Sequence, residues 1–192
     1  MSETKRIETE IKFELSADEF AFCAEKLPVF GYHELGTFNF SDYFFDIKRF
    51  QGNKYDFTRV RVIDDHTYEM TKKLWKTNEK GEPYRIEEEK NISKEEFEAY
   101  KTSQPYLSCN KKRKNFEGKI MDILCVFSLD SLEFSDEKRF FIECELDGVS
   151  EIDSHSIRNR LKREVFNLLN LSDRDEGIGM MALVLQKAEV EI

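Results

Sequence analysis

Proline, glycine and cysteine are scarce in this chain, and each scarcity excludes an architecture. Three prolines and eight glycines among 192 residues form no Pro/Gly/Ser-rich linker that would divide the chain into domains, and no repeat occurs. The four cysteines (Cys23, Cys109, Cys125 and Cys144) form no CxxC pair and no paired Cys/His spacing. This argues against a structural zinc site and favours reduced thiols. We therefore expect a single domain over 1–192.

Long apolar runs and an excess of positive charge are also missing. The N-terminal residues 1–6 lack the apolar stretch of a signal peptide, and no later stretch is long enough to span a bilayer. The net charge of −9 argues against a protein that coats nucleic acid or an anionic membrane. We expect a cytoplasmic protein without a membrane partner, in which a local basic cluster can still bind a small anion.

Aromatic and charged residues are abundant instead. Aromatic residues make up 13% of the chain, with seventeen phenylalanines, and this argues against disorder despite a charged fraction of 36%. Capping boxes at Ser16 and Ser93 predict helices to about residues 28 and 101, and further helices are expected over 154–169 and from 172 or 175 to about 189. Strands are expected from residue 8 and over 38–45, 55–63, 66–75, 84–90, 110–116, 119–129 and 139–146. Many strands joined by short turns indicate a large antiparallel sheet or barrel.

The charges in these strands follow a period of two. In the segment Glu8-Thr9-Glu10-Ile11-Lys12, alternation places the three charged residues on one face and the others on the opposite face. The later strands repeat this parity. The expected ionic face comprises the acids Glu8, Glu10, Glu87, Glu89, Asp130, Glu143 and Glu145 and the bases Lys12, Arg59, Arg61, Lys73, Arg85, Lys111 and Arg113.

Such a face has two explanations. For one strand the simpler one is an outer face in water, as in most antiparallel sheets. Across many strands, helices can cover the apolar face from outside, so that the charges point into a lumen. Buried ions without partners cost several kcal/mol each. A mixture of acids and bases suits a polyanion bridged to divalent cations, because Arg and Lys bind phosphate oxygens and carboxylates hold hard metals.

The ordered motifs resemble those of the CYTH domain, shared by class IV adenylyl cyclases and thiamine triphosphatases within the triphosphate tunnel metalloenzymes. Each motif alone is unspecific, but their order is that of the family from residue 8 to at least residue 145. The matching segments are Glu8-x-Glu10-x-Lys12, the aspartate–aromatic segment 42–46, Arg59-x-Arg61, Thr71-x-Lys73, Arg85-x-Glu87-x-Glu89, Lys111-x-Arg113 with Phe116, Asp130, and Phe141-x-Glu143-x-Glu145. The connection 136–139 departs from the family, which often has Leu-Gly there.

The resemblance implies a mainly β, α+β fold: a closed eight-stranded antiparallel barrel, or tunnel, with helices packed outside. It implies a triphosphate ligand and Mg²⁺ or Mn²⁺. The implied metal ligands are Glu8, Glu10, Asp130, Glu143 and Glu145, and the implied phosphate-binding residues are Lys12, Arg59, Arg61, Lys73, Arg85, Lys111 and Arg113. Of these, Glu8, Glu10, Lys12, Arg59, Arg61, Lys73 and Arg113 are expected to be catalytic.

The leading hypothesis is hydrolysis of inorganic tripolyphosphate, thiamine triphosphate or a nucleoside triphosphate. The alternatives are a class IV adenylyl cyclase, an RNA 5′-triphosphatase, whose RNA end would be the one nucleic-acid partner, and a non-catalytic polyphosphate-binding module. A monomer and a homodimer stay open, as does the choice between Lys72 and Lys73 for the ionic face. Arg85 could instead pair with Glu87 or Glu89. Trp75 is expected in the core.

Overall fold

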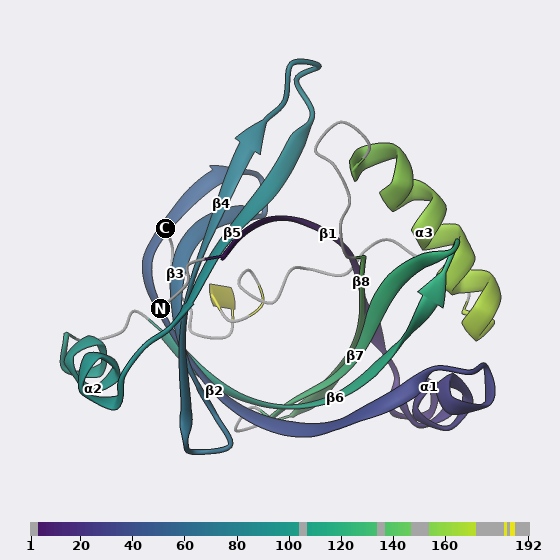
Figure 1. Ribbon diagram of the computed structural model, residues 1–192, viewed down its shortest axis with the longest axis horizontal. Helices are drawn as coiled ribbons and strands as arrows, with labels where there is room; N and C mark the ends of the chain where they lie inside the picture. The colour runs from purple at the N-terminus through teal and green to yellow at the C-terminus, as the bar shows by residue number, and fades with distance from the viewer. Residues whose placement is uncertain are drawn as a thin grey trace. The chain divides into compact units, whose positions relative to one another are not determined.

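The computed structural model describes residues 4–103, 107–133, 137–146, 154–171, 183 and 185–186, with the backbone alone for residues 4–8, 154 and 155. This part of the chain forms eight strands and three helices, in the order β1, α1, β2–β5, α2, β6–β8, α3 (Figure 1). The strands are β1 (Thr4–Leu15), β2 (His33–Gln51), β3 (Lys54–Ile63), β4 (Thr67–Thr77), β5 (Pro83–Asn91), β6 (Leu107–Ile120), β7 (Ile123–Glu133) and β8 (Lys138–Leu146). The helices are α1 (Ala17–Val29), α2 (Lys94–Thr102) and α3 (Ser154–Leu169). None of the helices in the described residues is long and apolar enough to cross a membrane.

The strands form one hydrogen-bonded order, β1-β5-β4-β3-β2-β6-β7-β8, in which β8 pairs again with β1. The β1/β8, β2/β3, β3/β4, β4/β5 and β7/β8 pairs are antiparallel. The predicted fold class, a mainly β protein built on an eight-stranded antiparallel sheet, is thereby confirmed.

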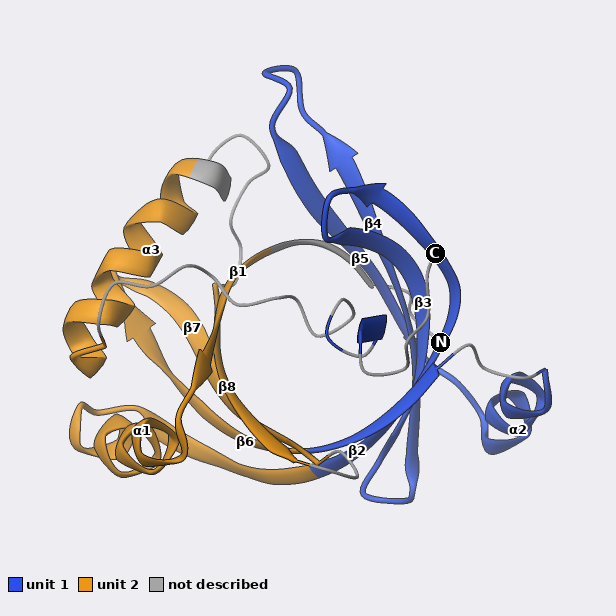
Figure 2. Ribbon diagram, turned by 180° about the vertical axis from the view of Figure 1, so that it is seen from behind, with its two compact units in different colours: residues 1–7, 39–111, 178–192 blue, residues 8–38, 112–177 orange. Residues whose placement is uncertain are grey.

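The chain divides into two compact units, shown in separate colours in Figure 2. Unit 1 comprises residues 1–7, 39–111 and 178–192, and unit 2 comprises residues 8–38 and 112–177. Strands β1, β2 and β6 contribute residues to both units, so the boundary cuts across strands instead of falling in a linker. A single domain over 1–192 stays a prediction.

In unit 2, α1 and α3 cover the apolar face of the sheet. Ile11 and Phe13 of β1 are fully buried in a core that also receives Leu27 of α1 and Leu161 of α3. The predicted capping box of α1 is present: the hydroxyl of Ser16 accepts from the amide of Glu19, whose carboxylate accepts from the amide of Ser16. This cap satisfies two backbone donors that a helix N-terminus leaves open.

In unit 1, α2 covers the corresponding apolar face. Phe97 of this helix lies among Phe45, Val60 and Met70, which come from β2, β3 and β4. Its predicted capping box, between Ser93 and Glu96, is also present. In each unit the helices therefore lie on the face opposite to the one that alternation assigns to the charges.

Several strand boundaries differ from the prediction: β1 begins at Thr4, β6 spans Leu107–Ile120 and β7 spans Ile123–Glu133. Strand β2 begins before residue 38 and continues to Gln51, past a bulge next to Asp46, whose φ is 52°. Residues 119–129 are not one strand, because Met121 and Asp122 form a turn with φ values of 55° and 62°. Neither turn residue is glycine or asparagine, the usual signals for positive φ. Most of the predicted C-terminal helix lies outside the described residues, of which Leu183, Leu185 and Gln186 are helical.

One close approach in unit 2 depends on Gly118. A Cβ at this position would lie 2.4 Å from Cδ1 of Tyr32. The ring of Tyr32 is held edge-on against Phe127, with ring centroids 4.9 Å apart, and its hydroxyl donates to the carbonyl oxygen of Lys119. The buried ring has little freedom to move aside.

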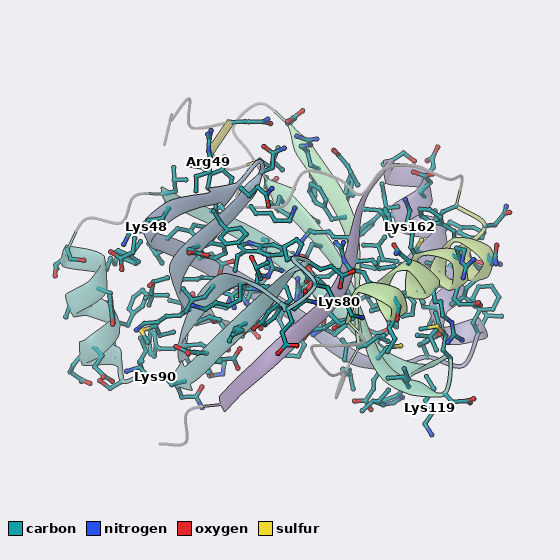
Figure 3. All side chains as sticks on the ribbon, turned by 90° about the horizontal axis from the view of Figure 1, so that it is seen from above. Lys48, Arg49, Lys80, Lys90, Lys119 and Lys162 are labelled. Carbon is teal, nitrogen blue, oxygen red and sulfur yellow. The ribbon has the colours of Figure 1, made fainter. Side chains whose placement is uncertain are left out.

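We therefore expect Gly118→Ala to destabilise the protein by about 1–3 kcal/mol, the usual cost of overpacking a core. Urea denaturation followed by circular dichroism measures the change. Lys119→Ala is the control, because this exposed side chain projects away from the ribbon on the same strand (Figure 3). Equal stabilities of the two variants would contradict the prediction.

Candidate functional site

The ionic face of unit 1 is organised by cross-strand register. Asp42 on β2 lies directly opposite Arg61 on β3, and its carboxylate accepts from Nε at 2.5 Å and from Nη2 at 2.8 Å. Asp42 is fully buried. Burial alone would raise the pKa of its carboxyl, but Arg61, Arg59 and Lys111 outweigh burial and hold the pKa far below its usual value. Asp42 is thus an anion that fixes the plane of the Arg61 guanidinium.

Arg59 is bound to the next strand. Its Nη2 donates to the hydroxyl of Thr71 at 2.8 Å and to the carboxylate of Glu69 at 3.2 Å. The hydroxyl of Thr71 donates to the same Glu69 oxygen at 3.0 Å. Arg59 and Arg61 are 9% and 6% exposed, so two guanidinium groups lie almost out of water on one strand.

The choice between Lys72 and Lys73 is decided by the register of β4 and β5. Lys73 lies opposite Glu87, and the two form an ion pair in which Glu87 is buried. Lys72 is exposed and lies opposite Glu88. Lys73 is therefore the lysine on the ionic face, as the parity predicted.

Lys111 and Arg61 both contact the aromatic ring of Phe40. Nζ of Lys111 lies 5.2 Å from the centroid of Phe40, and Cζ of Arg61 lies 4.3 Å from it. Burial is the main cause that raises the pKa of the nearby Cys109 thiol to about 12. Burial therefore favours the neutral thiol at Cys109.

The face that carries these charges in unit 1 is also partly apolar, which the parity count did not include. Phe44 lies opposite Arg59 and Phe57 lies opposite Lys73. Their rings meet edge to face, with centroids 5.7 Å apart, in a cluster that includes Leu107 and Leu185. Aromatic side chains therefore occupy part of the face that carries the ion pairs.

Unit 2 holds a second ionic network. The guanidinium of Arg113 donates to both oxygens of Asp130, at 2.6 and 2.7 Å, and Nη2 also reaches Glu143 at 3.2 Å. Nζ of Lys12 lies 2.9 Å from Glu143 and 3.7 Å from Asp130. Burial by itself lowers the pKa of both bases, but these carboxylates outweigh it, so the pKa of Lys12 and that of Arg113 lie above their usual values. Both bases are cations at any physiological pH.

Two glutamates oppose one another in the same unit. Glu10 on β1 lies directly opposite Glu145 on β8. Lys12 and Glu143 form the facing pair two residues further along the same two strands. Like charges in directly opposite positions destabilise a sheet unless a cation lies close to them. The guanidinium of Arg158 in α3 donates to the backbone oxygen of Glu10 at 2.8 Å and so ties this part of β1 to the helix.

The donor chemistry of this pair fits a hard divalent cation, which prefers carboxylate oxygens. Among the side chains that the structure describes, no three His, Cys, Asp or Glu residues are arranged to hold a metal. Glu8 is two residues before Glu10 on β1, and its side chain lies outside the described part. Glu10 and Glu145, which face each other across β1 and β8, are thus of the right ligand type for such a cation, with Glu8 as the further candidate ligand.

Arg85 and Glu89 on β5 were predicted site residues, whereas Asp42 and Glu69 belong to the ionic face without having been predicted. Arg85 is placed with its guanidinium carbon 5.3 Å above the ring of Trp75, and Glu89 lies opposite Thr71. The prediction of the site omitted Asp42 and Glu69. Asp42 belongs to the aspartate–aromatic segment 42–46, which lies near the end of the strand predicted over 38–45. Glu69 shares the parity of Thr71 and Lys73, so extending the alternation by one position identifies it.

The profile of the CYTH domain family matches residues 6–161. The chain belongs to this family. All the described members of the two ionic networks lie within the matched range. The comparison with curated proteins found no significant match.

Solved structures of CYTH-like proteins share the fold. The PH1012 protein of Pyrococcus horikoshii OT3 is 18% identical with a TM-score of 0.64, over 92% of this chain and 98% of that one. A putative adenylyl cyclase of Hippeastrum, with a dominant triphosphatase activity, is 17% identical with a TM-score of 0.62. The match covers 94% of this chain and 96% of that one. A putative adenylate cyclase of Bacillus halodurans is 17% identical with a TM-score of 0.63, over 95% and 97%. At these identities the likeness establishes the fold.

The Asp42–Arg61 pair generates a stability prediction. Asp42→Asn leaves Arg61 buried beside a neutral partner, so we expect a loss of about 3–5 kcal/mol in the free energy of unfolding at pH 7. Because the folded-state pKa of Asp42 is lowered, the pair stabilises the protein above the usual aspartate pKa of about 3.9 and loses this effect as the pH falls through the folded-state pKa. The difference in the free energy of unfolding between wild type and variant should therefore become smaller as the pH is lowered from 7 to about 3.

Urea denaturation at both pH values measures the two differences. Asp65→Asn is the control, because this aspartate is exposed in a turn and asparagine tolerates its positive φ of 64°. A difference that stays constant on acidification would contradict the assignment.

Proposed function

We propose that this protein is a metal-dependent triphosphatase that hydrolyses inorganic tripolyphosphate or an organic triphosphate. The observation that carries the proposal is that each unit places basic side chains and carboxylates on one strand face, away from the helices. Such sets bind phosphate oxygens through the bases and a divalent cation through the acids. Membership of the CYTH family supports the same ligand.

The acids of unit 2 are the proposed metal ligands. Glu10 and Glu145, together with Glu8, would hold a Mg²⁺ or Mn²⁺ ion, which when bound neutralises phosphate charge and lowers the pKa of a bound water. Asp130 and Glu143 are held by Arg113 and Lys12 in this structure. Phosphate oxygens that take over these bases would free the two carboxylates for the metal as well.

The bases are the proposed phosphate ligands. Arg59, Arg61 and Lys73 present donors that the fold already holds in place, and Lys12, Arg113 and Lys111 add fixed positive charge. Phosphoryl transfer relies on positioning and on stabilising charge at the transferred group. Preorganised guanidinium groups supply both, because they are oriented before the substrate arrives.

A panel of substrates tests the proposal. Tripolyphosphate, thiamine triphosphate, ATP and GTP are incubated with Mg²⁺ or Mn²⁺, and the release of orthophosphate is measured. We expect orthophosphate from at least one substrate and its loss with EDTA. Cyclic AMP and pyrophosphate from ATP would instead identify a cyclase, and tight binding without any product would identify a binding module.

Glu10 provides the sharpest test of the acids. We expect Glu10→Gln to lower kcat by at least about 100-fold, because the neutral amide is a poor ligand for a hard cation. Glu98→Gln, on the exposed face of α2, is the control for charge removal. A Glu10→Gln variant that folds, as judged by circular dichroism, and keeps full activity would refute the role of Glu10.

The neighbouring lysines form a matched pair for testing the bases. Lys73→Met removes a cation from the ionic face, whereas Lys72→Met removes one from the exposed face of the same strand. We expect the first to lower kcat/KM by about 10- to 1000-fold, as for other charge-stabilising groups, and the second to leave it within about twofold. Steady-state phosphate release at fixed Mg²⁺ measures both. Equal effects in the two variants would count against an assignment by strand face.

A further inference from the structure

An aromatic and cationic cluster lies at one end of the ionic face of unit 1. It consists of Phe50, Lys54, Trp75 and Arg85, contributed by β2, β3, β4 and β5, and is called here the strand-end cluster. The rings of Phe50 and Trp75 are stacked, with an interplanar angle of 20° and centroids 6.3 Å apart. Nζ of Lys54 and Cζ of Arg85 lie 5.5 and 5.3 Å from the centroid of Trp75.

The cluster is not part of a hydrophobic core, which corrects the expectation that Trp75 is a core residue. Trp75 is half-buried, and Phe50 is 37% exposed. Because the ring of Phe50 is open to solvent, stacking it on Trp75 removes little apolar surface from water and contributes little to stability. The same strand end carries Arg49, labelled in Figure 3, whose guanidinium carbon lies 5.7 Å from the ring centroid of Tyr55.

The position of the cluster ties it to the phosphate-binding bases. Trp75 follows Lys73 by two residues on the same face of β4, and Arg85 precedes Glu87 by two residues on the same face of β5. Two residues along a strand span about 6.7 Å. The backbone of Trp75 is fixed as well, because its amide donates to the carboxylate of Asp56 at 2.7 Å. A phosphate chain that is bound at Lys73 and runs along β4 toward Trp75 would therefore place a group attached to that end near the two rings.

We propose that the strand-end cluster binds the base of a nucleoside triphosphate, with the base stacked on the exposed ring of Phe50 and the α-phosphate contacted by Lys54 and Arg85. This inference rests on the proposed function and names the substrate class of that site. Stacking on an aromatic side chain tolerates any base, because each has a π-face. The two cations disfavour a positively charged ring such as the thiazolium of thiamine, since like charges would be brought together.

A steady-state comparison tests the proposal. Phe50→Ala should lower the ratio of kcat/KM for ATP to kcat/KM for tripolyphosphate by about tenfold, since stacking contributes about 1–3 kcal/mol per base. Phe22→Ala is a matched control: Phe22 lies on α1, is 38% exposed and also has a lysine, Lys26, 5.8 Å from its ring centroid. A ratio that is the same in both variants and the wild type would overturn the proposal, as would equal losses on both substrates.

A binding experiment separates this inference from the proposed function. Trp75 is the only tryptophan in the sequence, so its fluorescence reports directly on the cluster. The β,γ-imido analogue of ATP with Mg²⁺ should change this emission and bind about tenfold more weakly to Phe50→Ala than to Phe22→Ala. Thiamine triphosphate should bind more weakly than the ATP analogue.

The outcomes are distinguishable. If no triphosphate is hydrolysed but the analogue binds with the expected dependence on Phe50, the triphosphatase proposal fails and the base site stands. If triphosphates are hydrolysed but the analogue binds both variants equally, the base site is refuted and the triphosphatase proposal stands. Tighter binding of thiamine triphosphate than of the analogue would refute the preference for a neutral base.

Discussion

A charge that leaves water must meet an opposite charge or hydrogen-bonding groups, and the ionic faces of this protein are arranged around that requirement. Arg61 meets Asp42, Arg113 meets Asp130, and Lys73 meets Glu87, each across neighbouring strands. The cost of removing an ion from water is several kcal/mol, so these pairings constrain the register of the strands as firmly as the apolar faces do. A slip of one residue would move the acids and bases to the helix-covered face together.

These pairings also shape how a ligand can bind. The bases that suit a phosphate chain already donate to carboxylates, so phosphate binding has to exchange one set of hydrogen bonds for another. Under the proposed function, the net affinity would be a difference between two similar interactions, and a divalent cation would favour the exchange by binding the released carboxylates. Glu10 lies opposite Glu145 and already interacts with the cations Lys12 and Arg113, so a bound divalent cation would join an existing network of opposite charges.

The aromatic residues have separate roles in the two units. In unit 2 they fill the core beneath α1 and α3, as Phe13 and Phe127 do. In unit 1, Phe44 and Phe57 share a face with Arg59 and Lys73, where they lower the local dielectric constant and strengthen the ion pairs. Phe50 and Trp75 do neither, because they are stacked at the end of the face with access to solvent. That difference underlies our proposal that they contact the base of a nucleoside triphosphate.

The sequence determined the fold class, the capped helices and the parity of the charges, because alternation along a strand and capping at a helix end are local properties. Spacing to Thr71 left Lys72 and Lys73 both open for the ionic face, and the register of β4 against β5 decided for Lys73. Only the tertiary structure decided which charges meet: the Asp42–Arg61 and Arg113–Asp130 pairs depend on strand register, which residues far apart in the chain set together. The same holds for Trp75 on β4, because its stacking on Phe50 of β2 depends on how these strands are placed in the sheet, which the periodicity of β4 alone does not reveal.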